Sequence, residues 1–374
     1  MQILADIPST GENTYNVDIL DRENRLNKVF VMTRGSNSVD VIDTTTLETK
    51  KTIELQHYPR SAAYNSILGL MLISGKNKAM SSLIDVKTEE VVMVVGEDRV
   101  TSPSDFGGSN ATGHPIWFSV NQFGLIDREK RTVELFKIEK KDNGWSIKSQ
   151  DKIKTPTSIH HIVRERNLYP DMSETAEDFQ LSSKHFYGAL EGSPKDKIAP
   201  GIIEIILADD KLIVGKKMDI GFDESITKGI HHISFHPTNK ELLYVPSKEG
   251  TLYVVNYKKM KVESTIKTGK GSGHITFVPK RDLAIVTNHN DTFISIVDTK
   301  TDKLIKNIEV SEDAINNTIL QSHTQYVDKD ENFFYAFASD NGKFYELDLE
   351  NLIITRILYT GGTPKQGGFI NISK

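Results

Sequence analysis

The sequence contains no cysteine, and this absence restricts its chemistry more than any other feature of its composition. Disulfides, thiolate metal sites, iron–sulfur clusters and covalently attached c-type haem are excluded. A basic excess is also missing: the formal net charge is -5, which argues against binding to nucleic-acid phosphates. No run approaches about 18 apolar residues, so we expect no membrane-spanning helix. Residues 1–10 lack a basic start followed by an apolar stretch, so no signal peptide is expected in the chain as given.

The remaining composition is that of a folded chain. Hydrophobic residues make up 37% of its 374 residues and charged residues 26%, which differs from the composition of disordered chains. The length is large for a domain with one core. It is normal for a β-propeller, which grows by adding blades.

Internal repeats indicate the fold. Three segments align without a gap: Lys28–Leu55, Glu241–Thr268 and Leu283–Val310. Each has an apolar strand, a polar turn, an alternating strand, a second turn and a third strand, which is the period-two pattern of sheets packed between neighbouring sheets. Weaker copies begin near Leu70, Phe123, His185 and Phe333. Repeated strand groups at this spacing, without a helical period, predict a propeller.

Acidic residues mark one turn of the repeat. Asp43, Asp85, Asp298 and Asp348 each follow an apolar strand and precede a polar stretch. A short carboxylate at this position can accept hydrogen bonds from the backbone of the turn. We therefore expect these four side chains to hold turns between strands.

An inner strand precedes each group of three. The candidates begin at Ser61, His114, His161, His232, His274 and His323, with further ones at Tyr15–Leu20 and Gln366–Phe369. The sequence contains seven sets of outer strands but eight candidates for inner strands, so one candidate cannot be assigned to a blade. The pattern predicts an all-β, seven-bladed β-propeller in which the C-terminal strand joins the blade begun by the N-terminus, which closes the ring and removes an open edge.

The predicted organisation is one domain over residues 1–374. The approximate blades are 15–56, 57–97, 112–154, 157–222, 229–269, 271–311 and 320–360, with a closing strand in 361–374. The fourth blade carries an insertion, residues 162–184. An excursion of this length is either functional, for example a partner contact, or a tolerated surface loop.

The segments KVFVMTRGSNSVDVIDTTT and LAIVTNHNDTFISIVDTKT resemble the YVTN-type propeller repeat. The resemblance covers nearly the whole chain and implies the fold more strongly than the function. It extends to the propellers of nitrous oxide reductase, thiocyanate dehydrogenase and haem-containing nitrite reductases. Because most such relatives are exported, it implies a periplasmic or extracellular location.

Five histidines occupy matching positions on the predicted inner strands: His114, His161, His232, His274 and His323. Inner strands of a propeller line its central channel, so these imidazoles would form a ring at one height. Imidazole suits zinc, copper, iron and nickel. The resemblance to nitrous oxide reductase favours copper. A haem held non-covalently by one of these histidines is the alternative cofactor.

Two inner strands offer no histidine: one has Arg60–Ser61 and the closing one has Lys365–Gln366. Positive charge there would orient a small anionic substrate. The doublets His160–His161 and His231–His232 offer additional imidazoles. The competing interpretation is structural, because Gly113–His114 and Gly273–His274 resemble the Gly-His pairs that serve hydrogen-bond networks in WD-type propellers.

Two functional hypotheses follow. The first is a copper-binding redox propeller that acts on a small nitrogen or sulfur compound, with a small-molecule substrate or an electron-transfer protein as partner. The second is a non-catalytic propeller, either a scaffold subunit of a larger redox complex or a surface binding protein, that uses residues 162–184 and 101–113 as contacts.

Overall fold

A computed structural model describes residues 2–3, 14–18, 28–33, 35–43, 45–46, 48–101, 110–142, 144–165, 183–224, 226, 228–311, 321–328, 330–338, 342–359 and 369–370. The side chains of residues 2–3, 14–18, 321–324 and 369–370 lie outside this description. The described part consists of strands and one short 3-10 helix, Pro279–Arg281. It contains no helix with the length and apolar character needed to cross a bilayer.

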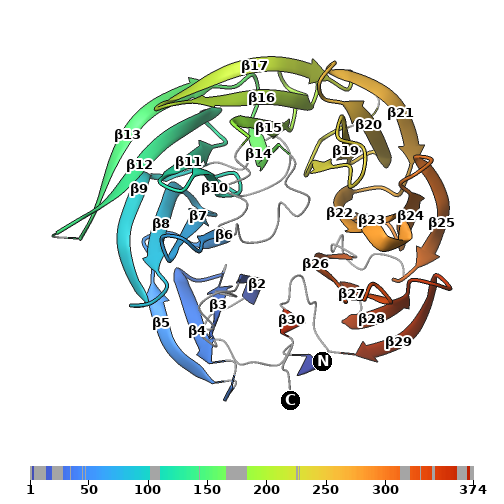
Figure 1. Cartoon of the computed structure of the whole chain (residues 1–374), viewed down its shortest axis with the longest axis horizontal. Coiled ribbons are helices and arrows are strands. Elements are labelled where there is room, and N and C mark those ends of the chain that lie inside the picture. The colour runs from blue at the N-terminus through green and yellow to red at the C-terminus, as the bar shows by residue number, and fades with distance from the viewer. Residues whose placement is uncertain are drawn as a thin grey trace. The chain divides into compact units, whose positions relative to one another are not determined.

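The strands form seven four-stranded antiparallel sheets, each built from four consecutive strands (Figure 1). The fold is therefore the all-β, seven-bladed β-propeller that the repeats predict. The chain divides into two compact units. Residues 7–222, here the N-terminal unit, hold four blades, and residues 1–6 with 223–374, the C-terminal unit, hold three. That residues 1–374 act as one domain stays a prediction.

The sheets of the N-terminal unit are β2 (Thr14–Asp18), β3 (Lys28–Thr33), β4 (Ser38–Asp43) and β5 (Thr49–Glu54); β6 (Pro59–Asn65), β7 (Leu70–Gly75), β8 (Lys78–Asp85) and β9 (Glu90–Val100); β10 (Ile116–Ser119), β11 (Gln122–Asp127), β12 (Thr132–Lys141) and β13 (Gly144–Lys154); and β14 (Ile159–Arg164), β15 (His185–Leu190), β16 (Gly201–Ala208) and β17 (Lys211–Asp219). Those of the C-terminal unit are β18 (Ser234–Phe235), β19 (Leu242–Ser247), β20 (Thr251–Asn256) and β21 (Lys261–Lys267); β22 (Ser272–Val278), β23 (Leu283–Asn288), β24 (Phe293–Asp298) and β25 (Lys303–Glu309); and β26 (Gln321–Val327), β27 (Phe333–Ala338), β28 (Lys343–Asp348) and β29 (Ile353–Tyr359).

The chain termini pair with each other, but not in the way the sequence predicts. Strand β30 (Phe369–Ile370) pairs with β1 (Gln2–Ile3) as a separate two-stranded sheet. The first blade does not need the C-terminal strand, because β2 supplies its first strand and β3 to β5 the rest. The expectation that the C-terminal strand completes that blade is therefore wrong. The candidate that is not needed for a blade is therefore Gln366–Phe369, whose last residue is the first residue of β30.

The turns after the third strands confirm the predicted role of the acidic residues. Asp43 Oδ1 accepts hydrogen bonds from the backbone N–H of Thr45 at 2.7 Å and Thr46 at 3.0 Å. Lys50 and then these turn N–H groups lower the pKa of Asp43 from 3.8 to about 2. The same pattern recurs at Asp85, Asp298 and Asp348. Each carboxylate thus holds the chain reversal that leads into the fourth strand.

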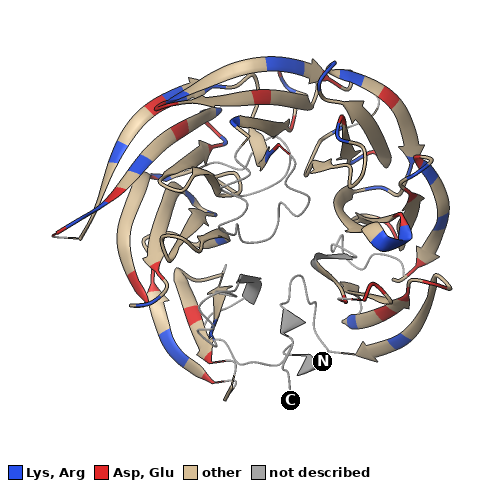
Figure 2. Cartoon of the chain, viewed as in Figure 1, with Lys and Arg blue, Asp and Glu red and all other residues tan. Residues whose placement is uncertain are grey.

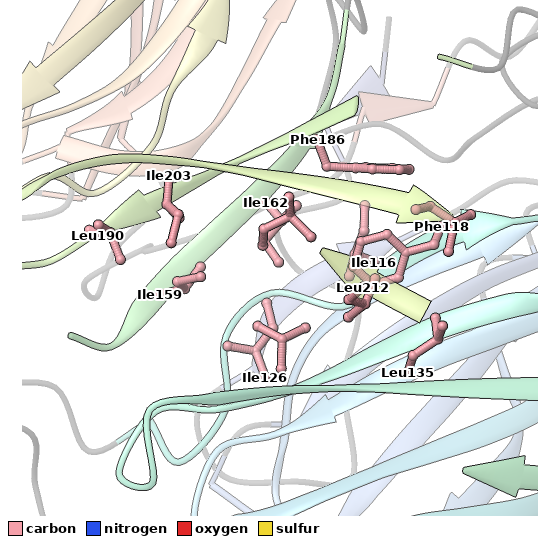
Figure 3. Packing of buried hydrophobic residues seen from close by; sticks show 13 residues of the cluster. Ile116, Phe118, Ile126, Leu135, Ile159, Ile162, Phe186, Leu190, Ile203 and Leu212 are labelled. Carbon is pink, nitrogen blue, oxygen red and sulfur yellow. The ribbon is translucent and has the colours of Figure 1, made fainter. Parts of the chain in front are cut away.

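The core consists of apolar layers between consecutive sheets. Figure 3 shows the layer between the sheets β10–β13 and β14–β17, where Phe118 meets Phe186 with ring centroids 4.7 Å apart. Burial of each such side chain contributes about 1.5–3 kcal/mol. Within the N-terminal unit, the sheet β10–β13 packs one face against the preceding sheet β6–β9 and the other face against the following sheet β14–β17. This explains the period-two pattern of the repeats.

Charge is distributed unevenly across each sheet. The fourth strands carry much of it, as in TKKTIE of β5, KVESTIK of β21 and KLIKNIE of β25, and they are largely exposed (Figure 2). The first strands β14 and β22 instead hold buried histidines. The fourth strands therefore interact with water, and the titratable groups with specific chemistry gather at the first strands.

His57 illustrates a histidine with a structural role. It is 1% exposed, with Nδ1 3.1 Å from Tyr58 O and Nε2 2.9 Å from Ser82 Oγ. The neutral ring satisfies both contacts, because Nδ1–H donates to the carbonyl and Nε2 accepts from the hydroxyl. Burial lowers the pKa of His57 from 6.5 to about 4.

A pH effect follows from this shift. The folded state resists protonation of His57, so its contribution to stability is complete above about pH 6.5 and is lost as the pH falls toward about 4. We expect the urea midpoint of the wild-type protein to fall between pH 7 and pH 5 more steeply than that of His57→Gln. Equal slopes for the two proteins would contradict the assignment.

Candidate metal centre

The predicted ligand positions fall on or just before the first strands of their sheets. His161 lies on β14, His274 on β22 and His323 on β26, whereas His114 and His232 lie two residues before β10 and β18. His114 and His161 belong to the N-terminal unit and the other three to the C-terminal unit. The side chain of His323 lies outside the described residues. A single ring of five histidines stays a prediction.

The C-terminal unit gathers histidines from three chain segments. His231, His274 and His289 each offer one ring nitrogen, and these nitrogens all lie within 4.8 Å of one another. His274 and His289 are 6% and 8% exposed, and His231 is half-buried. Residue 231 precedes β18, residue 274 belongs to β22, and residue 289 follows β23. We call this group the histidine triad.

His232 packs against the triad. Its ring centroid lies 4.1 Å from that of His274 and 4.7 Å from that of His231, and the residue is 2% exposed. The ring of His289 lies 5.2 Å from His274 and 5.8 Å from His231. Four imidazoles therefore share one buried place in this unit.

The hairpin of β22 and β23 explains why His289 reaches the triad. Ser272 pairs with Asn288 and His274 with Thr287, with an irregular register between them. His289 directly follows Asn288, so the returning chain brings it back beside the start of β22. Its backbone N–H donates to Gly271 O at 3.0 Å, which fixes the turn.

Gly273 provides the space for this ring. A Cβ at residue 273 would lie 2.7 Å from both Cδ2 and Nε2 of His289, closer than packed atoms approach. A residue with a side chain would therefore displace His289. In the Gly273–His274 pair, the histidine supplies one imidazole ring of the triad, and the glycine leaves room for the ring of His289.

The donor set fits a bare transition-metal ion. Imidazole nitrogens bind zinc, copper, nickel and iron, and a set without thiolates is the one that a chain without cysteine can offer. Tetrahedral coordination with bonds of about 2.0–2.1 Å spaces ligand nitrogens about 3.4 Å apart. Small rotations of the three rings reach that spacing from separations within 4.8 Å.

The N-terminal unit holds a second group of histidines. The ring of His114 lies 5.2 Å from those of both His160 and His161. His160 and His161 are each 4% exposed, and His114 is half-buried. The backbone N–H of His114 donates to His160 O at 2.9 Å, which joins the segment before β10 to β14.

Arg60 lies on β6 behind this group and is 3% exposed. Its Nη1 donates to Thr112 O, and its Nη2 lies 3.0 Å from His160 Nε2. The structure thus brings Arg60 to the second histidine group of its own unit. Its predicted role in orienting a substrate stays a prediction.

Other expectations fall partly or wholly outside the described residues. These are Lys365, most of the insertion 162–184, of which residues 166–182 are not described, and residues 102–109 of the segment 101–113.

Sequence reasoning missed His289 as a ligand and gave His231 only a supplementary place. It also missed Arg128 and Glu191, which lie beside the second group. Counting residues along the β22–β23 hairpin would have placed His289 next to Gly273. No local sequence pattern predicts that Arg128 and Glu191 lie beside this group, because their partners are distant in sequence.

No protein-family model matches the chain, and no curated protein sequence matches it. Among solved structures, dihydro-heme d1 dehydrogenase NirN in complex with DHE matches with a TM-score of 0.67 and 12% identity, over 96% of this chain and 68% of that one. Sqt1 from Saccharomyces cerevisiae matches with a TM-score of 0.67 and 10% identity, over 95% of this chain and 86% of that one. At such identities the likeness shows the fold alone, and it extends over nearly the whole chain.

Proposed function

We propose that this protein is a metal-binding redox β-propeller in which His231, His274 and His289 hold one transition-metal ion. The observation that carries the proposal is the approach of the three ring nitrogens to within 4.8 Å in a largely buried place. His232, in contact with two of these rings, is the fourth imidazole at the centre.

Copper is the metal we propose. An all-imidazole set suits copper or zinc, and copper adds a redox couple that zinc lacks. When bound, the ion would supply one-electron chemistry. The protein's own contribution is to hold three rings from separate segments, to shield His274 and His289 from water, and to keep His289 seated against Gly273.

A haem held non-covalently by one histidine is the alternative cofactor at this centre. A haem ligand must project its nitrogen toward an open face of the macrocycle, whereas His274 and His289 are almost wholly buried and packed against other rings. NirN is described as a dehydrogenase in complex with DHE. That description is compatible with a redox role for this chain, although the likeness concerns only the fold.

The substrate in this proposal is a small nitrogen or sulfur compound. It rests on the resemblance of the repeats to YVTN-type propellers, which is itself part of the proposal. A periplasmic or extracellular location rests on the same resemblance.

Metal analysis of protein purified without a histidine tag tests the proposal. We expect about one copper ion per chain by elemental mass spectrometry after loading, because the site offers one set of converging ligands. Nitrogen hyperfine structure in the copper(II) resonance spectrum would support imidazole ligation. A protein that takes up neither copper nor zinc, or whose copper signal shows no nitrogen coupling, would contradict it.

A further inference from the structure

A second cluster of titratable side chains lies in the N-terminal unit, apart from the histidine triad in sequence. It contains two guanidinium groups, three imidazoles and one carboxylate. We call it the basic cluster: Arg60, Arg128, His114, His160, His161 and Glu191. Five of the six residues are at most 4% exposed, and His114 is half-buried.

Arg128 and Glu191 form the fixed part of the cluster. Arg128 Nε donates to Glu191 Oε2 at 3.0 Å, and Arg128 Nη2 donates to Oε1 at 2.6 Å and to Oε2 at 2.8 Å. Arg128 Nη1 also donates to Asn110 O at 2.6 Å. This fork geometry is the strong form of the charged pair. It commits the one carboxylate of the cluster to an arginine.

His160 links Arg60 to the pair of Arg128 and Glu191. Its Nε2 lies 3.0 Å from Arg60 Nη2, which can only donate, so Nε2 accepts. Its Nδ1 lies 3.3 Å from Glu191 Oε1 and 3.4 Å from the same Arg60 Nη2. The ring of His160 therefore lies between a guanidinium donor and a carboxylate acceptor. Arg60 is thereby held in place by His160 and by Thr112 O.

Two guanidinium groups and one carboxylate give the cluster a formal charge of 2 - 1 = +1 with its imidazoles neutral. Charge buried in a medium of low polarisability acts over a longer distance than charge in water. The cluster therefore produces a positive potential at its most exposed member, His114. Imidazole N–H groups at the same place can donate hydrogen bonds to an anion.

Gly113 fixes the position of His114. A Cβ at residue 113 would lie 2.8 Å from three side-chain carbons of Ile126, and the Gly113 N–H donates to Ile126 O at 3.0 Å. The glycine allows the chain to press against β11. His114 follows directly and meets the rings of His160 and His161.

We infer that the basic cluster binds a small inorganic oxyanion, such as nitrite or sulfite, at the His114 and His161 rings, with Arg60 held at the neighbouring His160. Compact anions of one or two charges match a site of imidazole donors backed by a guanidinium. The inference names the substrate class of the proposed function. Calling the bound anion a substrate therefore rests on the proposed function. Binding itself requires no metal.

Titration calorimetry on metal-free protein, with sodium nitrite and sodium sulfite as the probes, tests the inference. His114→Gln is expected to weaken binding of the anions by about tenfold or more, since hydrogen bonds to charged groups are worth about 1.5–3 kcal/mol, or about 10- to 100-fold in affinity. Arg60→Gln is expected to weaken it at least as much. His114 is half-buried, so its variant tests the site even if Arg60→Gln does not fold.

His185→Gln is the matched control, because His185 is a half-exposed histidine of the same unit, bonded to Glu204 instead of the cluster. It should bind both anions like the wild type. Absence of binding by the wild-type protein up to high millimolar anion would overturn the inference, as would binding that His114→Gln leaves unchanged. Since the protein carries no metal in this experiment, failure here leaves the proposed metal centre untouched. If the protein binds the anions but takes up neither copper nor zinc in the separate metal analysis, only the proposed metal centre is overturned.

Discussion

Replacing His274 by alanine is expected to lower the affinity of the protein for copper at least about 100-fold, because even residues that only support metal ligands change affinity about 10- to 100-fold. His274 is the central member of the triad. Its ring lies 4.1 Å from His232, 5.2 Å from His289 and 5.4 Å from His231. Without it, the two remaining ligands come from separate loops. Competition titrations with a copper chelator measure the loss.

The same loss should be visible in thermal unfolding. A ligand that binds the folded state alone raises stability by RT ln(1 + [L]/Kd), so copper should raise the melting temperature of the wild type. The rise should vanish in His274→Ala. In His185→Ala it should persist, because His185 belongs to the other unit and contacts Glu204 at 2.8 Å.

Gly273→Ala tests whether copper affinity depends on the position of His289 and not only on the number of histidines. It keeps all four imidazoles but places a Cβ 2.7 Å from the ring of His289, which must move. We expect an intermediate loss of copper affinity, about tenfold or more. If both His274→Ala and Gly273→Ala bind copper as tightly as the wild type, the metal is held elsewhere. If His274→Ala does not fold, Gly273→Ala still provides the test.

The fold could be predicted from the sequence because its signals are local and repeated. The alternating valines Val39 and Val41 mark a strand, and both residues are 0% exposed. Asp298 marks the turn after β24 through hydrogen bonds only two and three residues away. The pairing of the chain ends could not be predicted in the same way. It depends on which of two inner-strand candidates fills the first blade, and their local patterns are alike.

The candidate centre was only partly predictable. Matching positions on first strands drew attention to His232 and His274, which do lie together with ring centroids 4.1 Å apart. His289 lies after a second strand, so a comparison of first strands passes over it. Its place follows from the hairpin register and from the missing side chain at Gly273, and the latter has meaning only in three dimensions.

Arg60 shows a different limit. The sequence suggests a cation beside a bound anion, because the inner strand that contains Arg60 offers no histidine. In the structure its contacts come from Thr112 and His160, 52 and 100 residues away in the chain. No local pattern encodes such partners. The arginine is a buried member of a cluster, and any effect on an anion acts together with His114.

The two Gly-His pairs differ in what the glycine does. Gly273 leaves room for the ring of His289, a side chain of the triad itself. Gly113 leaves room for Ile126, an apolar residue of β11, and so sets the path of the chain into His114. The pairs look equivalent in sequence. Structurally, Gly273 shapes the inside of the candidate metal centre, whereas Gly113 anchors the segment that carries His114 into the basic cluster.

Replacing Glu191 by alanine is expected to reduce the free energy of unfolding by about 3–5 kcal/mol, the usual cost of breaking a buried ion pair by removing one partner. The side chains of Arg128 and Glu191 are each 3% exposed, and they share three hydrogen bonds. Removal of the carboxylate leaves the buried guanidinium of Arg128 without its counter-ion, in a cluster that also contains the buried Arg60. Urea unfolding, followed by intrinsic fluorescence, measures the change.

Asp196→Ala is the matched control, because Asp196 pairs with Arg131 where the two side chains are 40% and 33% exposed. Its loss should cost much less than that of Glu191, since water screens exposed pairs. The double variant Arg128→Met/Glu191→Leu should recover much of the stability lost in Glu191→Ala, because it removes the stranded charge and fills the volume with apolar groups. Equal effects of Glu191→Ala and Asp196→Ala would mean that the basic cluster is open to water in solution. In that case its arginines would be screened, and the positive potential from which we infer anion binding at His114 would be lost.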